Sequence, residues 1–115
     1  MAMDGKNFFK GGVMEICEQR DGTAVTAFMS GKLNGISAPQ LEQYAQGLDA
    51  GVTALTLDMS ETTYVSSAGL RALLFAMKQV SARGGEGMKF VNIPEEIMDV
   101  LTMSGFAMLL GLDEE

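Results

Sequence analysis

The sequence contains no histidine and no tryptophan, and its only cysteine is Cys17. Histidine is the commonest general base and a frequent ligand of transition metals, so its absence argues against a hydrolytic triad and a zinc site. One cysteine cannot form a disulfide within the chain, and the apolar neighbours of Cys17 indicate a small buried side chain in a reducing compartment. We therefore expect no catalytic residue, no metal site and no cofactor.

Positive charge is also scarce, with 8 Lys and Arg against 15 Asp and Glu and a formal net charge of -7 at pH 7. Nucleic acids and anionic membranes are bound by clustered cations, so both are excluded as expected partners. No apolar run approaches the length of a membrane span, and residues 1–10 lack the apolar core of a secretion signal. We expect a cytoplasmic protein without membrane insertion.

The 115 residues, of which 47% are hydrophobic, are enough for one compact core. We divide the chain into an N-terminal extension over residues 1–12, a single domain over residues 13–112, and an acidic tail over residues 113–115.

The first part of the domain reads as a β-hairpin followed by a helix. Apolar residues alternate with polar ones on both sides of Asp21-Gly22, which is a strong turn signal and predicts strands over residues 13–19 and 24–29. Ser37 with Gln40 three residues later resembles a capping box, and apolar residues then recur at helical spacing. This pattern predicts the first helix.

Strands and helices alternate in the rest of the domain. We expect strands over residues 52–57 and 88–93, a polar loop over 59–67, a helix over 68–83, and a helix that begins at 94 and ends at Gly105, while residues 106–112 fit either a strand or a helix. Alternation of this kind predicts right-handed crossovers. The fold class is therefore α/β: one mixed, mainly parallel sheet of four to five strands that starts with an antiparallel hairpin, with three to four helices.

Two adjacent serines, Ser66 and Ser67, stand where the helix over residues 68–83 begins. One can cap the helix by accepting a hydrogen bond from a free backbone N–H, which leaves the other hydroxyl available. A phosphate on Ser67 would be tolerated by the positive end of the helix dipole, so this residue is a candidate switch. Gly69 weakens the first helical turn, and either a closely approaching partner or crowding against the sheet explains it.

The same helix has two different faces. Its core arc is predicted to contain Leu70, Leu73, Leu74, Met77 and Val80. The opposite arc carries Arg71, Phe75 and Lys78, and no acidic residue occurs between Ala68 and Arg83. This arc fits a contact surface, or alternatively a solvated face with Phe75 tucked against a neighbouring element.

The sequence LDMS at 57–60 followed by YVSSAGL at 64–70 resembles the signature of the STAS domain family, typified by anti-sigma factor antagonists. SGKLN at 30–34 ahead of PQL at 39–41 resembles the turn before the first helix of that family. VNIP at 91–94 resembles its fourth strand and the start of the next helix. The resemblance spans most of residues 13–112.

The resemblance implies a function. Family members of this type bind an anti-sigma factor that has a histidine-kinase-like ATPase domain and acts as a serine kinase; phosphorylation releases the antagonist and a serine phosphatase restores it. By position, the phosphorylated serine corresponds to Ser67. The expected partner-binding residues are Asn34, Ser66, Ser67, Gly69, Arg71, Phe75 and Lys78.

Two departures from the family pattern keep other functions open. Many phosphorylated members carry Asp where this chain has Ser66 and Asn34, which suits an unmodified adaptor subunit of a transporter ATPase or signalling complex. An enzyme is disfavoured, because Ser67-x-Gly69 is only half of a nucleophile elbow and Val65 replaces its first glycine. Ten methionines hint at a carrier of an apolar ligand, although core filling explains them equally.

Overall fold

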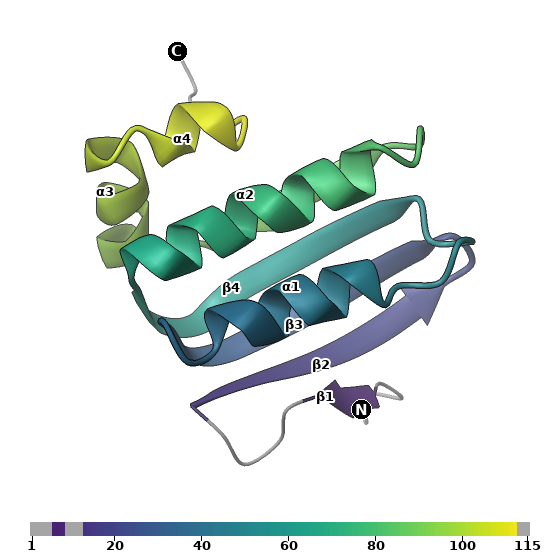
Figure 1. The fold of residues 1–115 in the computed structure, drawn as a ribbon, viewed down its shortest axis with the longest axis horizontal. Helices are drawn as coiled ribbons and strands as arrows, with labels where there is room; N and C mark the ends of the chain where they lie inside the picture. Colours follow the sequence, from purple (N-terminus) through teal and green to yellow (C-terminus); the bar gives the residue numbers. More distant parts are fainter. Residues whose placement is uncertain (1–5, 9–12, 113–115) are drawn as a thin grey trace.

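The computed structural model describes residues 6–8 and 13–112, with side chains over 13–112 (Figure 1). The strands are β1 (Lys6–Phe8), β2 (Met14–Asp21), β3 (Ala24–Leu33), β4 (Ala54–Val65) and β5 (Gly87–Val91). The helices are α1 (Ala38–Gln46), α2 (Ser67–Ser81), α3 (Glu95–Met103) and α4 (Phe106–Leu109).

The strands form one five-stranded sheet in the order β1-β2-β3-β4-β5. β1, β2 and β3 pair antiparallel, whereas β3, β4 and β5 pair parallel. The parallel pairs are joined by α1 and α2, which lie side by side over one face of the sheet (Figure 1). This arrangement confirms the expected α/β class with its N-terminal hairpin.

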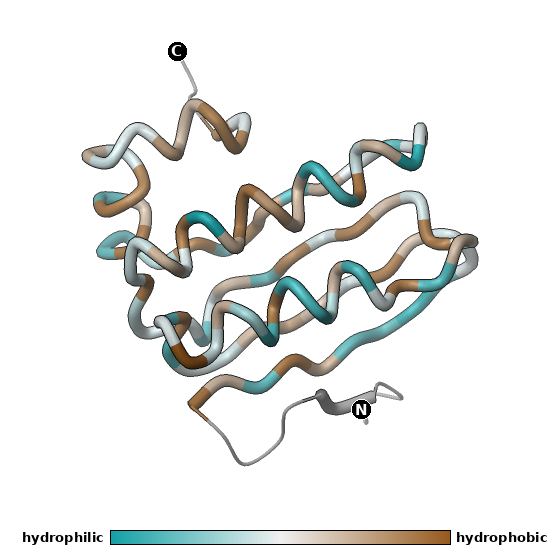
Figure 2. The backbone as a smooth tube through the Cα atoms, in the orientation of Figure 1, coloured by the Kyte–Doolittle hydropathy of each residue, from teal (hydrophilic) through white to brown (hydrophobic). Residues whose placement is uncertain are grey.

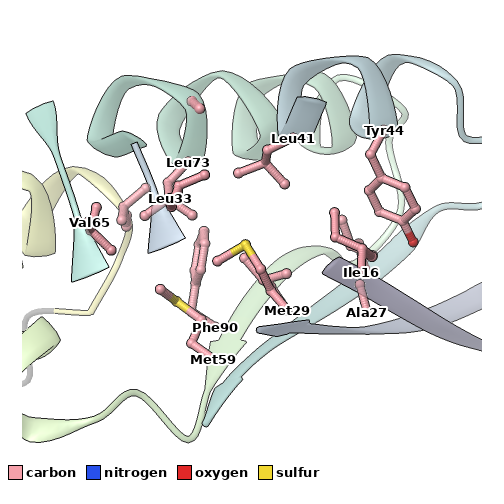
Figure 3. Close-up of a cluster of buried hydrophobic side chains, with 14 of the residues drawn as sticks. Ile16, Ala27, Met29, Leu33, Leu41, Tyr44, Met59, Val65, Leu73 and Phe90 are labelled. Atoms are coloured by element: carbon pink, nitrogen blue, oxygen red, sulfur yellow. The ribbon is translucent and has the colours of Figure 1, made fainter. Parts of the chain in front are cut away.

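The core fills the space between the sheet and these two helices. Alternate residues of the central strands are fully buried there, among them Met29 on β3 and Leu57 on β4. α1 contributes Leu41 and Tyr44 and α2 contributes Leu73, as Figure 3 shows. Hydrophobic and hydrophilic segments alternate along both helices in Figure 2, as expected for helices with one buried face.

β4 is much longer than the sequence predicts. We expected a strand to residue 57 and a polar loop over 59–67, but the strand continues to Val65, so the loop prediction is wrong. β3 also extends past Met29 to Leu33, and its additional residues pair with the second half of β4 across two register shifts. The polar residues in the second half of β4 can form a strand because their backbone N–H and C=O groups make hydrogen bonds with β3.

The capping box at the start of α1 is also a wrong prediction. Ser37 is the N-cap residue, but its hydroxyl makes no capping bond to the helix. The hydroxyl instead donates to the carbonyl of Lys32 at 2.6 Å and accepts from the amide of Asn34 at 2.9 Å. Ser37 is fully buried, and its hydrogen bonds close the turn that precedes α1.

The remaining expectations fall close to the observed elements. Asp21 ends β2 at the hairpin turn, where Gly22 has a φ of 66°. α3 begins after Pro94 and ends before Gly105, and the segment left open between strand and helix contains the short helix α4. β1 lies within the stretch assigned to an N-terminal extension, whereas the acidic tail lies outside the described residues.

Two side-chain predictions need adjustment. Cys17 is half-buried rather than buried, because it lies on the sheet face opposite to the helices, in register with Phe28. On α2 the buried residues are Gly69, Leu70, Ala72, Leu73, Ala76 and Val80. Leu74 and Met77 pack at the edge of the core instead.

Among the described residues, no helix combines the length and apolarity needed to cross a bilayer.

Candidate functional site

The start of α2 is fixed against the end of β3. The amide of Ser66 donates to the carbonyl of Leu33 at 2.9 Å. A Cβ atom on Gly69 would lie 2.5 Å from that carbonyl oxygen and 2.8 Å from Cγ of Leu33, distances at which atoms overlap. The missing side chain of Gly69 is therefore explained by crowding against the sheet, and the residue is buried.

The two serines have different environments. Ser66 is the N-cap of α2, with an extended backbone at φ -93° and ψ 176°, and its Oγ accepts from the amide of Gly69 at 3.2 Å. Ser67 is the first helical residue and is exposed to solvent. The first amides of any helix lack intrahelical acceptors, so the hydroxyl of Ser67 lies beside free N–H donors. Ser66 thus caps the helix, and Ser67 is not needed for that role.

Asn34 organises the turn between β3 and α1. Its Oδ1 accepts from the amides of Ile36 at 2.9 Å and Ser37 at 3.2 Å. Asn34 directly follows Leu33, the residue that contacts Ser66 and Gly69. The structure therefore brings the turn at 34–37 and the first turn of α2 to the same end of the sheet.

Arg71 and Lys78 are exposed on α2, and Phe75 is half-buried between them. Together with Ser67, these residues are separated by four, four and three positions, so they lie along one side of the helix. Within residues 13–112 neither cation takes part in an ion pair; the pair present there is Arg20 with Asp49. The structure thus places four of the predicted partner-binding residues on one accessible stripe, and Ser66 and Asn34 at its end.

Two exposed apolar residues at this end of the sheet escaped the sequence analysis. Ile36, in the turn before α1, has 70% of its surface exposed, and Tyr64, near the end of β4, has 49% exposed. Tyr64 is in register with Lys32 on β3. An isolated isoleucine in a turn has no periodicity that would reveal it, whereas Tyr64 belongs to the motif at 64–70, where the sequence predicts a loop.

A buried carboxylate stabilises the neighbouring part of the sheet. Asp58 on β4 accepts from the amide of Ser60 at 2.9 Å and from Nδ2 of Asn92 at 2.8 Å. Burial raises the pKa of Asp58, but the hydrogen bonds from Ser60 and Asn92 outweigh it and the net effect lowers the pKa. Asn92 has a positive φ of 54° in the turn between β5 and α3, and its hydrogen bond to Asp58 connects this turn to β4.

This end of the molecule presents the solvent-exposed hydroxyl of Ser67 beside exposed cationic and apolar side chains. Among residues 13–112, no three His, Cys, Asp or Glu side chains gather closely enough to hold a metal ion. The surface instead combines Ser67, two cations and exposed apolar side chains. Mixed apolar and cationic surfaces of this kind suit protein binding.

Residues 16–114 match the family model of the STAS domain. A curated Bordetella bronchiseptica protein named "Putative anti-sigma factor antagonist BtrV" is 35% identical over 81 residues, covering 70% of this chain and 69% of that protein. The crystal structure of an anti-sigma factor antagonist from Mycobacterium paratuberculosis has a TM-score of 0.69 at 20% identity, over 83% of this chain and 80% of that one. The Bacillus cell fate determinant SpoIIAA in its phosphorylated form has a TM-score of 0.59 at 18% identity, over 82% of this chain and 86% of that one.

Proposed function

The chain belongs to the STAS domain family, and we propose from this membership that it is an anti-sigma factor antagonist. In this proposal it binds an anti-sigma factor with a histidine-kinase-like ATPase domain in the cytoplasm. Binding occupies the anti-sigma factor, and phosphorylation of Ser67 ends the interaction. A serine phosphatase returns the protein to its binding state.

The observation that carries this proposal is that Ser66 and Ser67 have different structural roles. Ser66 accepts the capping hydrogen bond from Gly69, and Ser67 is exposed one residue later. A kinase can reach the Ser67 hydroxyl without breaking a bond that holds the fold. The name of the SpoIIAA structure indicates that this fold exists in a phosphorylated form, which supports the same switch here.

The proposed contact surface is centred on Ser67 and follows α2 through Arg71 and Lys78. Ile36 supplies apolar area at the same end of the sheet, and Tyr64 adds an exposed aromatic ring on the face opposite to α1 and α2. Exposed aromatic and aliphatic residues next to cations are typical of the buried centre and the rim of a protein interface. The partner face is therefore expected to carry acidic groups opposite Arg71 and apolar groups opposite Ile36.

The switch itself is a phosphoryl transfer. The Ser67 oxygen forms a bond to the γ-phosphorus of ATP, the bond from that phosphorus to the bridging oxygen breaks, ADP leaves, and the hydroxyl proton is released. The new group carries about -1.5 to -2 charges and three acceptor oxygens. It repels an acidic partner face and prevents close packing over the start of α2, while the fold is preserved.

The test is phosphorylation by a co-encoded kinase of the histidine-kinase-like class. With ATP, the mass of the wild-type protein should rise by one phosphate, and Ser67→Ala should show no rise. Ser60→Ala is the control, since Ser60 is an exposed serine within β4, away from the start of α2, and its loss should not affect the gain. Phosphate gained by Ser67→Ala, or lost only in Ser60→Ala, would contradict the assignment.

An adaptor that is never phosphorylated is the second candidate, and the residues at 34 and 66 favour it. Asn34 and Ser66 keep the hydrogen bonds of the turn and the cap without the negative charge of aspartate. Such a subunit would hold a transporter ATPase or a signalling complex with the same surface. Stable binding to one of these complexes, together with no phosphate gain from any co-encoded kinase, would favour it.

A further inference from the structure

Arg71 lies one helical turn after Ser67 and is the nearest cation to it along α2. Residues four positions apart on a helix are neighbours, with Cβ atoms about 5–6 Å apart. Both side chains are exposed, so both are free to adopt a shared arrangement. Within the described part of the chain, Arg71 has no ion pair.

The surroundings leave Arg71 without a competing carboxylate on its own helix. The sequence contains no Asp or Glu between Glu61 and Glu86, a stretch that includes all of α2. An anionic group four residues before a cation is the more favourable order on a helix. Guanidinium groups bind phosphate through two parallel hydrogen bonds, which a lysine ammonium cannot reproduce.

We infer that a phosphate on Ser67 is held in cis by the guanidinium of Arg71. This inference rests on the proposed function, because it concerns the phosphorylated state of the same site. Phosphorylation then has two effects on the contact surface: it adds a dianion at position 67, and it withdraws the cation at position 71 from the partner. The switch removes a favourable contact as well as introducing a repulsive one.

Other cations near the site provide the comparison. Lys78 lies eleven positions after Ser67 on α2, too far along the helix to share its phosphate. Lys32 on β3 is exposed and is in register with Tyr64, two residues before the cap of α2. Lys32 adjoins the buried Leu33, so it lies on the sheet face opposite to α1 and α2 and is not expected to contact a phosphate that Arg71 holds.

The experiment uses the full chain with phosphoserine incorporated at position 67 during synthesis, so that no kinase is required. The second ionisation of the phosphate, with a pKa of about 6 in free phosphoserine, is followed by phosphorus NMR across pH 4–8. A neighbouring cation favours the dianion and lowers this pKa, so Arg71→Gln should raise the midpoint by about 0.3 pH units or more. Lys78→Gln should leave the midpoint at the wild-type value.

Two results would overturn the inference. One is a midpoint in Arg71→Gln equal to that in Lys78→Gln, and the other is a shift in Lys32→Gln with none in Arg71→Gln. Arg71→Lys provides a second variant that keeps the charge, and a partial shift is expected because the bidentate contact is lost. Because the phosphate is installed directly, these results are independent of whether a kinase modifies Ser67 or an anti-sigma factor binds the chain.

Discussion

At the scale of single residues, Ser66 and Ser67 illustrate how neighbouring hydroxyls acquire different roles. The extended backbone of Ser66 points its Oγ at the amide of Gly69, whereas Ser67 is already helical and exposed. The first hydroxyl is a structural acceptor and the second is free for chemistry. The two side chains are identical, and the change from an extended to a helical backbone between residues 66 and 67 gives them different roles.

This difference predicts opposite consequences of truncation. Ser66→Ala should lower the free energy of unfolding by about 1 kcal/mol, because the cap is lost, while Ser66→Asp should largely preserve it. Ser67→Ala should change stability by less than about 0.5 kcal/mol, as expected for an exposed position. Urea denaturation of the three variants measures this, and equal losses at the two serines would refute the assignment of the cap.

Gly69 is predicted to tolerate no side chain. Gly69→Ala places a methyl group 2.5 Å from the carbonyl oxygen of Leu33, so we expect a loss of about 1–3 kcal/mol, typical of an overpacked position. Gly35→Ala is the matched control, because a Cβ there has no heavy atom within 4 Å. Denaturant unfolding should show a lower midpoint only for the first variant, and equal midpoints would contradict the crowding explanation.

Sequence patterns and resemblance indicated the role of Ser67 but not the geometry around it. Two adjacent serines before a helix imply one cap and one spare hydroxyl, and the structure assigns the cap to Ser66. The reason for Gly69 was open, because its contact with Leu33 joins residues 36 positions apart in the chain. A local sequence pattern cannot reveal a contact between residues that are far apart in the chain.

At the scale of elements, the sequence predicted the hairpin and the helices α1, α2 and α3 well, left the segment of α4 open between strand and helix, and predicted β4 poorly. These three helices have periodic apolar faces, which one window of sequence reveals. The second half of β4 is polar and resembles a loop, and it becomes a strand because the extended β3 pairs with it. Strand length is therefore set by the partner strand, which lies about 30 residues away.

The capping box at Ser37 failed for a related reason. The residue types at 37 and 40 fit the motif, but the hydroxyl of Ser37 is used by Lys32 and Asn34. The carbonyl of Lys32 and the amide of Asn34 compete with the helix amides for the hydroxyl of Ser37. Because the turn is buried, its backbone groups take the hydrogen bonds and the helix amides do not. The spacing of residues alone does not include this competition.

The link between β4 and the turn before α3 leads to a prediction about pH. The lowered pKa of Asp58 means that its carboxylate is stabilised in the folded state. Its contribution to stability is therefore complete well above about pH 4, the ordinary value for unfolded Asp, and is lost as the pH falls through the lower folded-state value. Acid should weaken the attachment of this turn.

Asn92→Gly tests this contribution, because glycine accepts the positive φ at position 92 and only the amide donor is lost. At pH 7 the variant should be less stable by about 1.5–3 kcal/mol, the magnitude of a hydrogen bond to a charged group. The difference should shrink as the pH falls below about 4. Urea denaturation between pH 7 and pH 3 measures it, and a difference that stays constant with pH would contradict the role of Asp58.

At the scale of the whole molecule, two distant segments meet at one end of the sheet. The turn at 34–37 follows β3 and the first turn of α2 follows β4, and because β3 and β4 are parallel, with Leu33 in register with Val65, both lie at the carboxyl ends of these strands. The sequence motifs indicated Asn34 and Ser67 as candidate site residues, and the parallel pairing of β3 with β4 brings the turns that contain them to the same end of the sheet. The sequence did not predict Ile36, whose exposure depends on how the turn is closed by Asn34 and Ser37.

This convergence predicts that binding depends on residues from separate elements while folding does not. Arg71→Glu on α2 and Ile36→Ser in the turn should each weaken binding to the cognate anti-sigma factor by about tenfold or more, equivalent to about 1.4 kcal/mol. Both residues are exposed, so the thermal midpoint should remain nearly unchanged. Calorimetric titration of the partner and thermal unfolding of each variant measure the two quantities.

Lys89→Glu is the control for this experiment, because it reverses an exposed cation elsewhere on the surface. Lys89 on β5 is in register with Thr56, next to the buried Leu57, so it lies on the sheet face opposite to α1 and α2. Its reversal makes the same change in net charge as Arg71→Glu. Equal weakening of binding by Lys89→Glu and Arg71→Glu would mean that binding depends on the total charge of the protein. Loss of folding in Arg71→Glu would show that Arg71 has a structural role. Weakening confined to Arg71 and Ile36 would place the partner over the start of α2, where the hydroxyl of Ser67 can control it.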